Sequence, residues 1–252
     1  MIGGSLPAAS GLVAVLAGIS GCTGDGDSPF VPLRPVLPFF VTDSNPQNLA
    51  QGVPTSVVID VGFSDVPFPP DLAGSWTLAS FAVRYTGLAR ADLVDRRVRV
   101  RAARGLEVYW EYTLTLAPTL HSFAGVALPG KATVDFVTGG GPGDAVTDPP
   151  ARALAADVLP ALAGCASASC HTHSASADGL DLETAEGVAA AVGRSSRDQP
   201  GSALVVPSDH AQSYLVWKAL GLPHTVGHQE PALSHDAARV LADWIDEGAR
   251  ND

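Results

Sequence analysis

Residues 97–101 of the 252-residue chain read RVRVR, a strict alternation of arginine and valine. Successive side chains of a β-strand point to opposite faces of the sheet, so this stretch predicts a strand that buries its valines and exposes its arginines. Other short stretches are likewise rich in Val, Thr and aromatic residues and are separated by turn residues. We predict strands at residues 56–63, 80–85, 97–101, 112–116 and 131–137. Several such strands over about 100 residues predict a β-sandwich.

Two segments without apolar periodicity bound this β-rich region. Residues 23–38 (TGDGDSPFVPLRPVLP) and 138–150 (TGGGPGDAVTDPP) are rich in Gly, Asp and Pro, as expected of a tether and a linker. Residues 11–22 (GLVAVLAGISGC) belong to an apolar run that is shorter than the ~20 residues needed to cross a bilayer. We therefore interpret that run as the core of a signal peptide.

The end of this run, Ile19-Ser20-Gly21-Cys22, resembles a bacterial lipobox. The resemblance implies cleavage before Cys22 and a diacylglycerol on its thiol, which makes the membrane a partner. Thr23 follows the cysteine, where an Asp would favour retention at the inner membrane, so we expect an outer-membrane lipoprotein of the cell envelope. Disulfides and covalent haem are both possible in that compartment.

The β-rich region also resembles the bacterial Ig-like domain first described in surface-layer proteins. The matching stretches are TDSNPQNLAQGVP (42–54), SVVIDVGFSDVP (56–67), YWEYTLTLAPTLHSFAGVAL (109–128) and ATVDFVTG (132–139). The resemblance implies an Ig-like sandwich that serves for spacing or adhesion.

Charge separates the two halves of the chain. Residues 36–138 carry 8 Lys and Arg against 9 Asp and Glu, whereas residues 150–252 carry 6 against 13. The acidic second half favours a basic partner protein. With a net charge of −11, the chain lacks the basic surface that nucleic-acid binding requires.

The acidic half predicts helices. Residues 148–165 place apolar side chains at helical spacing, with a kink or end expected at Pro160. Residues 234–248 form an apolar stripe between an N-cap at Ser234 and a C-cap at Gly248. These features predict a small all-α domain.

Between these helices lies AGCASASCHTHS, residues 163–174. Covalent haem c would use the thiols of Cys165 and Cys170 and the imidazole of His171, although the four-residue gap replaces the usual gap of two. A zinc ion could take both cysteines, His171 and His173. A disulfide between Cys165 and Cys170 would leave the histidines exposed. The local chemistry leaves all three readings open.

Three stretches after this cluster resemble the class I-like cytochrome c domains of planctomycete and myxobacterial envelope proteins. They are GLDL (179–182), SALVVPSDHAQSYLVWK (202–218) and WIDEGA (244–249). The resemblance implies one covalent haem c on Cys165 and Cys170, His171 as axial iron ligand, and one-electron transfer with a redox partner protein. The only methionine is Met1, so the sixth ligand would be His228, with His224 as the second choice.

Taken together, the sequence predicts a multidomain protein in which an all-β Ig-like sandwich precedes a small all-α cytochrome c-like domain. The expected boundaries are a signal peptide at 1–21, a tether at 22–37, the sandwich at 38–138, a linker at 139–149 and the cytochrome-like domain at 150–252. The competing hypothesis is a haem-less envelope scaffold or binding module with a Cys165–Cys170 disulfide. No nucleophile with a paired base emerges, so an enzyme is not expected.

Overall fold

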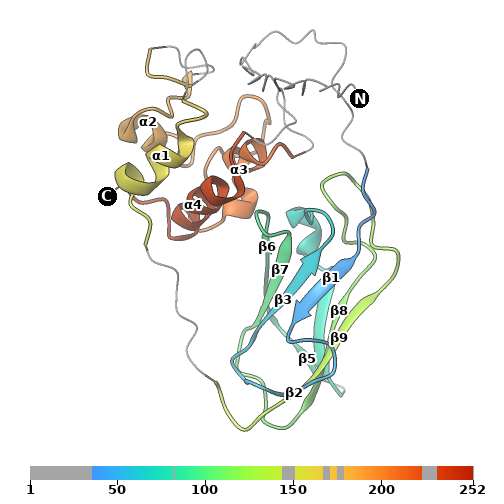
Figure 1. The fold of residues 1–252 in the computed structure, drawn as a ribbon. Helices are drawn as coiled ribbons and strands as arrows, with labels where there is room; N and C mark the ends of the chain where they lie inside the picture. The colour runs from blue at the N-terminus through green and yellow to red at the C-terminus, as the bar shows by residue number, and fades with distance from the viewer. Residues whose placement is uncertain are drawn as a thin grey trace, which may run out of the picture.

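The computed structural model describes residues 36–81, 83–143, 151–166, 171–174, 179–222 and 232–251. Residues 36–143 form two β-sheets, and the helical segment that follows lies at one end of them (Figure 1). Among the described helices, none is long and apolar enough to span a membrane.

Sheet A contains four strands and sheet B contains five. Sheet A has the order β1 (Val41–Asn45), β3 (Val58–Phe63), β7 (Arg97–Ala102), β6 (Gly87–Asp92). Sheet B has the order β2 (Ala50–Val53), β9 (Ala132–Thr138), β8 (Glu111–Leu116), β4 (Trp76–Ser80), β5 (Val83–Tyr85). Neighbouring strands are antiparallel, except that β2 and β9 are parallel. The order β1-β3-β7-β6 opposite β9-β8-β4 is that of the ABED and GFC sheets of an immunoglobulin-type sandwich.

The alternation in RVRVR has the predicted consequence. Val98 and Val100 on β7 are completely buried between the sheets, while the arginines of the strand point outward from sheet A.

On β8, the hydroxyl of buried Tyr112 accepts a hydrogen bond of 2.8 Å from the backbone N–H of Glu107, five residues upstream. This is the tyrosine-corner contact of immunoglobulin-type domains. Burial and the adjacent Tyr85 hydroxyl raise the pKa of Tyr112 to about 12. The region in which strands were predicted is therefore a β-sandwich.

Individual strands differ from the prediction. The single strand expected at 80–85 is instead the last residue of β4, a turn and β5, because Phe81 adopts a left-handed backbone with φ 50° and the chain reverses there. Residues 76–79 of β4 were not predicted as a strand. Strands β1, β2 and β6 were not predicted either. Their sequences, VTDSN, AQGV and GLARAD, lack the regular apolar alternation that marks a half-buried strand.

The expected all-α cytochrome-like domain is absent from the described residues, so the fold-class prediction is wrong in its second half. The segment contains η2 (Leu154–Val158), α1 (Leu159–Leu162), α2 (Ala185–Ala189), η4 (His210–Gln212), α3 (Tyr214–Ala219) and α4 (His235–Asp246), and a further short helix, η1 (Pro69–Leu72), belongs to the sandwich. In the segment only α4, with 12 residues, exceeds six residues. Its buried side chains join those of the sandwich in one hydrophobic core.

The ends of α4 follow the sequence prediction. The Ser234 hydroxyl accepts a hydrogen bond from the backbone N–H of Ala237, as an N-cap residue does. At the other end Gly248 has φ 103°, a conformation that glycine adopts without steric cost and that commonly ends a helix.

Candidate functional site

The Cys and His stretch lies after α1. Cys165 is half-buried and forms no disulfide within the described residues, and burial raises the pKa of its thiol. His171 is half-buried, with Nδ1 3.2 Å from the carbonyl oxygen of Leu180. His173 is exposed and pairs with Asp181 at 2.9 Å, and this carboxylate raises the pKa of the imidazole. The two described imidazoles therefore contact different partners.

This arrangement does not support the predicted haem, so the cofactor and electron-transfer predictions are corrected. Within the described residues no group of three or more His, Cys, Asp or Glu side chains could hold a metal ion. The spacing of the cysteines departs from the C-x-x-C-H motif. The apolar side chains of η2 and α1, Leu154, Val158 and Leu162, are completely buried and pack in the protein core.

Several predicted residues lie outside the described part of the chain. They are Cys22, Cys170, His224 and His228. The structure therefore places Cys165 and His171, but it describes neither the proposed sixth ligand nor the lipidation site.

A buried carboxylate joins the sandwich to the C-terminal segment. Asp92, at the end of β6, has a side chain that is 1% exposed. Its Oδ1 accepts a hydrogen bond of 2.6 Å from Nη2 of Arg239 on α4, and its Oδ2 lies 3.1 Å from Nη2 of Arg99 on β7. Burial strongly opposes the charge of Asp92, but Arg239, His210 and Arg99 together lower its pKa. The carboxylate is therefore held ionised at the junction.

A buried histidine continues this junction. His210 on η4 donates from Nδ1 to Asp246 at 2.8 Å, while Nε2 accepts a hydrogen bond of 3.3 Å from the backbone N–H of Leu93. Burial opposes ionisation of Asp246, but the hydrogen bonds from His210 lower its pKa. Arg90 on β6 also crosses the junction and donates to the carbonyl oxygen of Ser208 at 2.9 Å.

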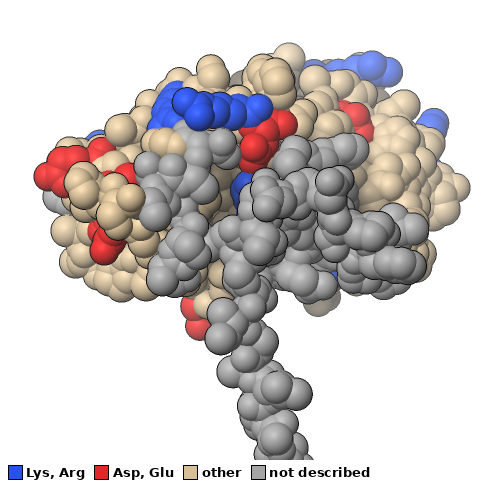
Figure 2. Space-filling view, turned by 90° about the horizontal axis from the view of Figure 1, so that it is seen from above, with Lys and Arg blue, Asp and Glu red and all other residues tan. Residues whose placement is uncertain are grey.

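We call the residues of this contact the junction network: Asp92, Asp95, Arg99, His210, Arg239 and Asp246. Beside it, the rings of Phe123 and Trp217 meet edge to face with centroids 5.2 Å apart. Figure 2 views the molecule from the end that carries the C-terminal segment and shows basic and acidic side chains beside one another on the described surface, whereas Asp92 and His210 of the network are buried. The junction is therefore fixed by paired charges and aromatic packing together.

Sequence reasoning missed the junction network. Arg239 and Asp92 are 147 residues apart, and His210 and Leu93 are 117 apart, so no local motif connects them. His235 Nε2 also reaches across the junction and lies 3.0 Å from Oδ1 of Asp95.

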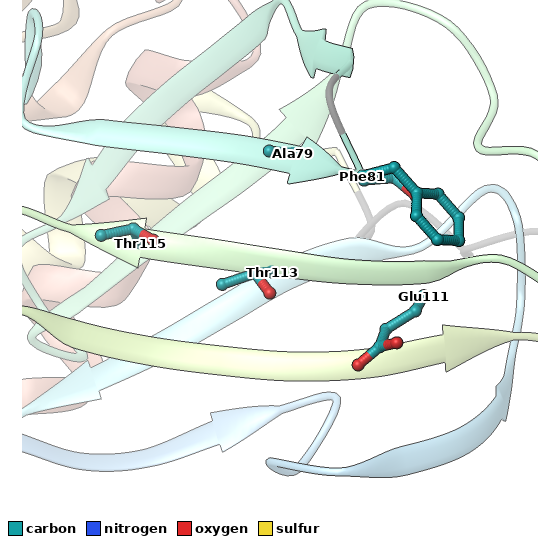
Figure 3. Close-up of a pocket in the computed structure, with 6 residues that line it drawn as sticks. Ala79, Phe81, Glu111, Thr113 and Thr115 are labelled. Carbon is teal, nitrogen blue, oxygen red and sulfur yellow. The ribbon is translucent and has the colours of Figure 1, made fainter.

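A second surface lies on the outer face of sheet B, at the end far from the C-terminal segment (Figures 1 and 3). A pocket of about 340 Å³ there runs from the turn after β4 across β8. Figure 3 shows the Phe81 ring at one end of it and the side chains of Thr113, Thr115 and Glu111 along the strand. Ala79 and Ser80 complete the lining.

Exposed aromatic residues edge this pocket. Phe81 is 85% exposed, and its ring meets that of Trp110 edge to face at 5.8 Å. Tyr109, the neighbour of Trp110, is 74% exposed. Phe81 and Tyr109 have φ values of 50° and 59°, conformations that are strained for bulky residues and that cluster at functional sites. We call Phe81, Tyr109 and Trp110 the aromatic edge.

Comparisons with known proteins identify no family, because no family model and no curated protein matches the sequence. Among solved structures, the N-terminal part of the bacterial S-layer protein SbsC aligns with 13% identity and a TM-score of 0.30, covering 41% of this chain and 24% of that one. CopC from Methylosinus trichosporium OB3b gives 13% identity and a TM-score of 0.32, covering 43% and 99%. L,D-transpeptidase 1 from Mycobacterium tuberculosis aligns with 19% identity and a TM-score of 0.27, covering 39% of this chain and 38% of that one. At these scores the likenesses assign neither function nor ligand to this chain.

Proposed function

We propose that this chain is a haem-less binding module of the bacterial cell envelope. In this proposal residues 1–21 are a signal peptide, Cys22 carries the lipid anchor at the outer membrane, and residues 22–37 are a tether that holds the sandwich away from the bilayer. The lipobox-like residues before Cys22 support this address. The C-terminal segment acts as a cap that is fixed to one end of the sandwich.

The observation that carries the binding role is the aromatic edge beside the sheet B pocket. The Phe81 ring is 85% exposed, so a partner that removes it from water lowers the free energy of the complex. Aromatic residues are also enriched in binding hot spots. The hydroxyls of Thr113 and Thr115 line the same pocket. The Thr113 hydroxyl donates to Asp135, so its oxygen remains as an acceptor. This combination suits an envelope component that offers an apolar group beside hydroxyl or amide groups.

Co-sedimentation with isolated cell envelopes tests this role. All proteins carry Cys22→Ser, so that no lipid anchor can attach them to the membranes. We expect Phe81→Ser to weaken binding about 10-fold, since truncating a central aromatic anchor removes a binding hot spot. The matched control is Phe40→Ser, an exposed aromatic residue before β1, which should bind like the parent chain. Equal binding by the Phe81 and Phe40 variants would contradict the assigned surface.

A further inference from the structure

A cleft of about 380 Å³ lies between the outer face of sheet A and the C-terminal segment. Strands β3, β6 and β7 supply one wall and η4 and the end of α4 supply the other. The lining residues are Val58, Leu88, Arg90, Ala91, Asp92, Arg99, Arg101, Asp209, His210 and Asp246. The cleft is separate from the aromatic edge, which belongs to sheet B.

Two arginines on the sheet wall have no ion-pair partner among the described residues. Arg101 on β7 is exposed and forms no ion pair with any described residue. Arg90 on β6 is also exposed, and its guanidinium donates only to the neutral carbonyl of Ser208. Two guanidiniums therefore face the cleft with charge available for an anion, and a guanidinium binds a carboxylate through paired hydrogen bonds.

The opposite wall carries negative charge. Asp209 is half-buried, and its Oδ1 accepts the backbone N–H of Gln212 but meets no basic side chain among the described residues. Its carboxylate therefore favours a ligand with an ammonium group or another N–H donor.

The length of the cleft limits the size of the ligand. Leu88 and Asp92 both line it and lie four residues apart on β6, a span of about 13 Å at ~3.3 Å per residue. An extended tripeptide spans about 10 Å. Arg90 and Arg101 on the sheet wall and Asp209 on the opposite wall form no ion pair within the described residues, so a ligand that carries both charges can satisfy both walls.

We propose that this cleft binds a small zwitterion of amino-acid or short-peptide chemistry, with its carboxylate on Arg90 and Arg101 and its ammonium group toward Asp209. This site goes beyond the proposed envelope binding on sheet B and does not depend on it. Because the contacts are ionic, binding weakens as the salt concentration rises.

Calorimetric titration of the full chain with glycine, diglycine and triglycine tests the proposal. We expect triglycine to bind more tightly than glycine, because the longer molecule fills more of the length of the cleft between Leu88 and Asp92. N-acetyl-triglycine, which lacks the ammonium group, and triglycine amide, which lacks the carboxylate, should each bind about 10-fold more weakly. No heat from triglycine at millimolar concentration, or equal affinity for the blocked peptides, would overturn the proposal.

Variants locate the site. Arg101→Gln and Asp209→Asn should each weaken triglycine binding about 10-fold. Neither change removes an ion pair within the described residues, so the unfolding temperature should stay unchanged. The matched control is Arg84→Gln, an exposed arginine on β5 of the other sheet, which should bind triglycine like the parent. The cleft would not be the binding site if Arg101→Gln bound triglycine with wild-type affinity. The same conclusion would follow if Arg84→Gln lost as much triglycine affinity as Arg101→Gln.

Discussion

Replacing Asp92 with alanine should lower the free energy of unfolding by about 3 kcal/mol, because Arg239 and Arg99 both lose their shortest ion pair and keep only longer contacts to other carboxylates. The Arg239 guanidinium donates to Asp92 at 2.6 Å, and the Asp92 side chain is 1% exposed. Removing one member of a buried pair costs more than the pair itself contributes, because the remaining charge stays desolvated. Denaturant unfolding followed by tryptophan fluorescence measures the difference.

The effect of Asp92→Ala should depend on pH in a defined direction. The pKa of Asp92 is lowered in the folded protein, so its contribution is fully present above its unfolded value of about 3.9 and is lost as the pH falls through the lower folded value. The difference in unfolding free energy between the wild type and Asp92→Ala should therefore become smaller below about pH 4.

Glu111→Ala is the control for this measurement. Glu111 is exposed on β8 and forms no ion pair within the described residues, so its removal should change the unfolding free energy by less than about 0.5 kcal/mol. A cost below about 1 kcal/mol for Asp92→Ala at pH 7 would show that the junction network contributes little to stability.

Replacing Trp217 with alanine should cost about 3 kcal/mol or more, as large-to-small changes of buried aromatic residues do. Trp217 is 6% exposed, donates from Nε1 to the Ala211 carbonyl at 2.7 Å and packs edge to face on Phe123. Because the two rings come from the two parts of the chain, the cost includes loss of contact between them. Tyr109→Ala, which changes an aromatic side chain that is 74% exposed, serves as the control and should cost less than about 0.5 kcal/mol.

A double-mutant cycle separates packing at the junction from packing within each part. Phe123→Ala and Trp217→Ala should show a coupling energy of about 1 kcal/mol, in the range of aromatic pairs. The wild-type chain should unfold in one transition, since both parts share one core. Additive effects together with two separate transitions would mean that the C-terminal segment folds as an independent domain.

The sequence was most informative where the signal was local. The alternation of RVRVR and YTLTL predicted β7 and β8, and Ser234 predicted the start of α4, because each signal depends on neighbouring residues. The turn at Phe81 was not predictable, since a bulky residue with positive φ contradicts ordinary preference. The junction depends on Asp92 and Arg239, whose meeting is a consequence of the tertiary fold.

The haem prediction failed for a different reason. It relied on the Cys-His dipeptide at 170–171 and on three loosely matching stretches, although the cysteine gap and the absence of a second methionine already departed from the pattern. In the fold, one of those stretches supplies Trp217 to the sandwich contact and His210 to the junction network. The apolar residues of this stretch, which resembled part of a cytochrome domain, therefore pack the C-terminal segment against the sandwich.

We infer that the C-terminal segment caps the sandwich and carries no haem. The intact mass and absorbance spectrum of the full chain, after export in cells that also express the haem c attachment machinery, test this inference. We predict a mass that polypeptide processing and lipid account for, with no Soret band. A Soret band together with a mass increase of one haem, both lost in a Cys165→Ser/Cys170→Ser variant, would contradict the account.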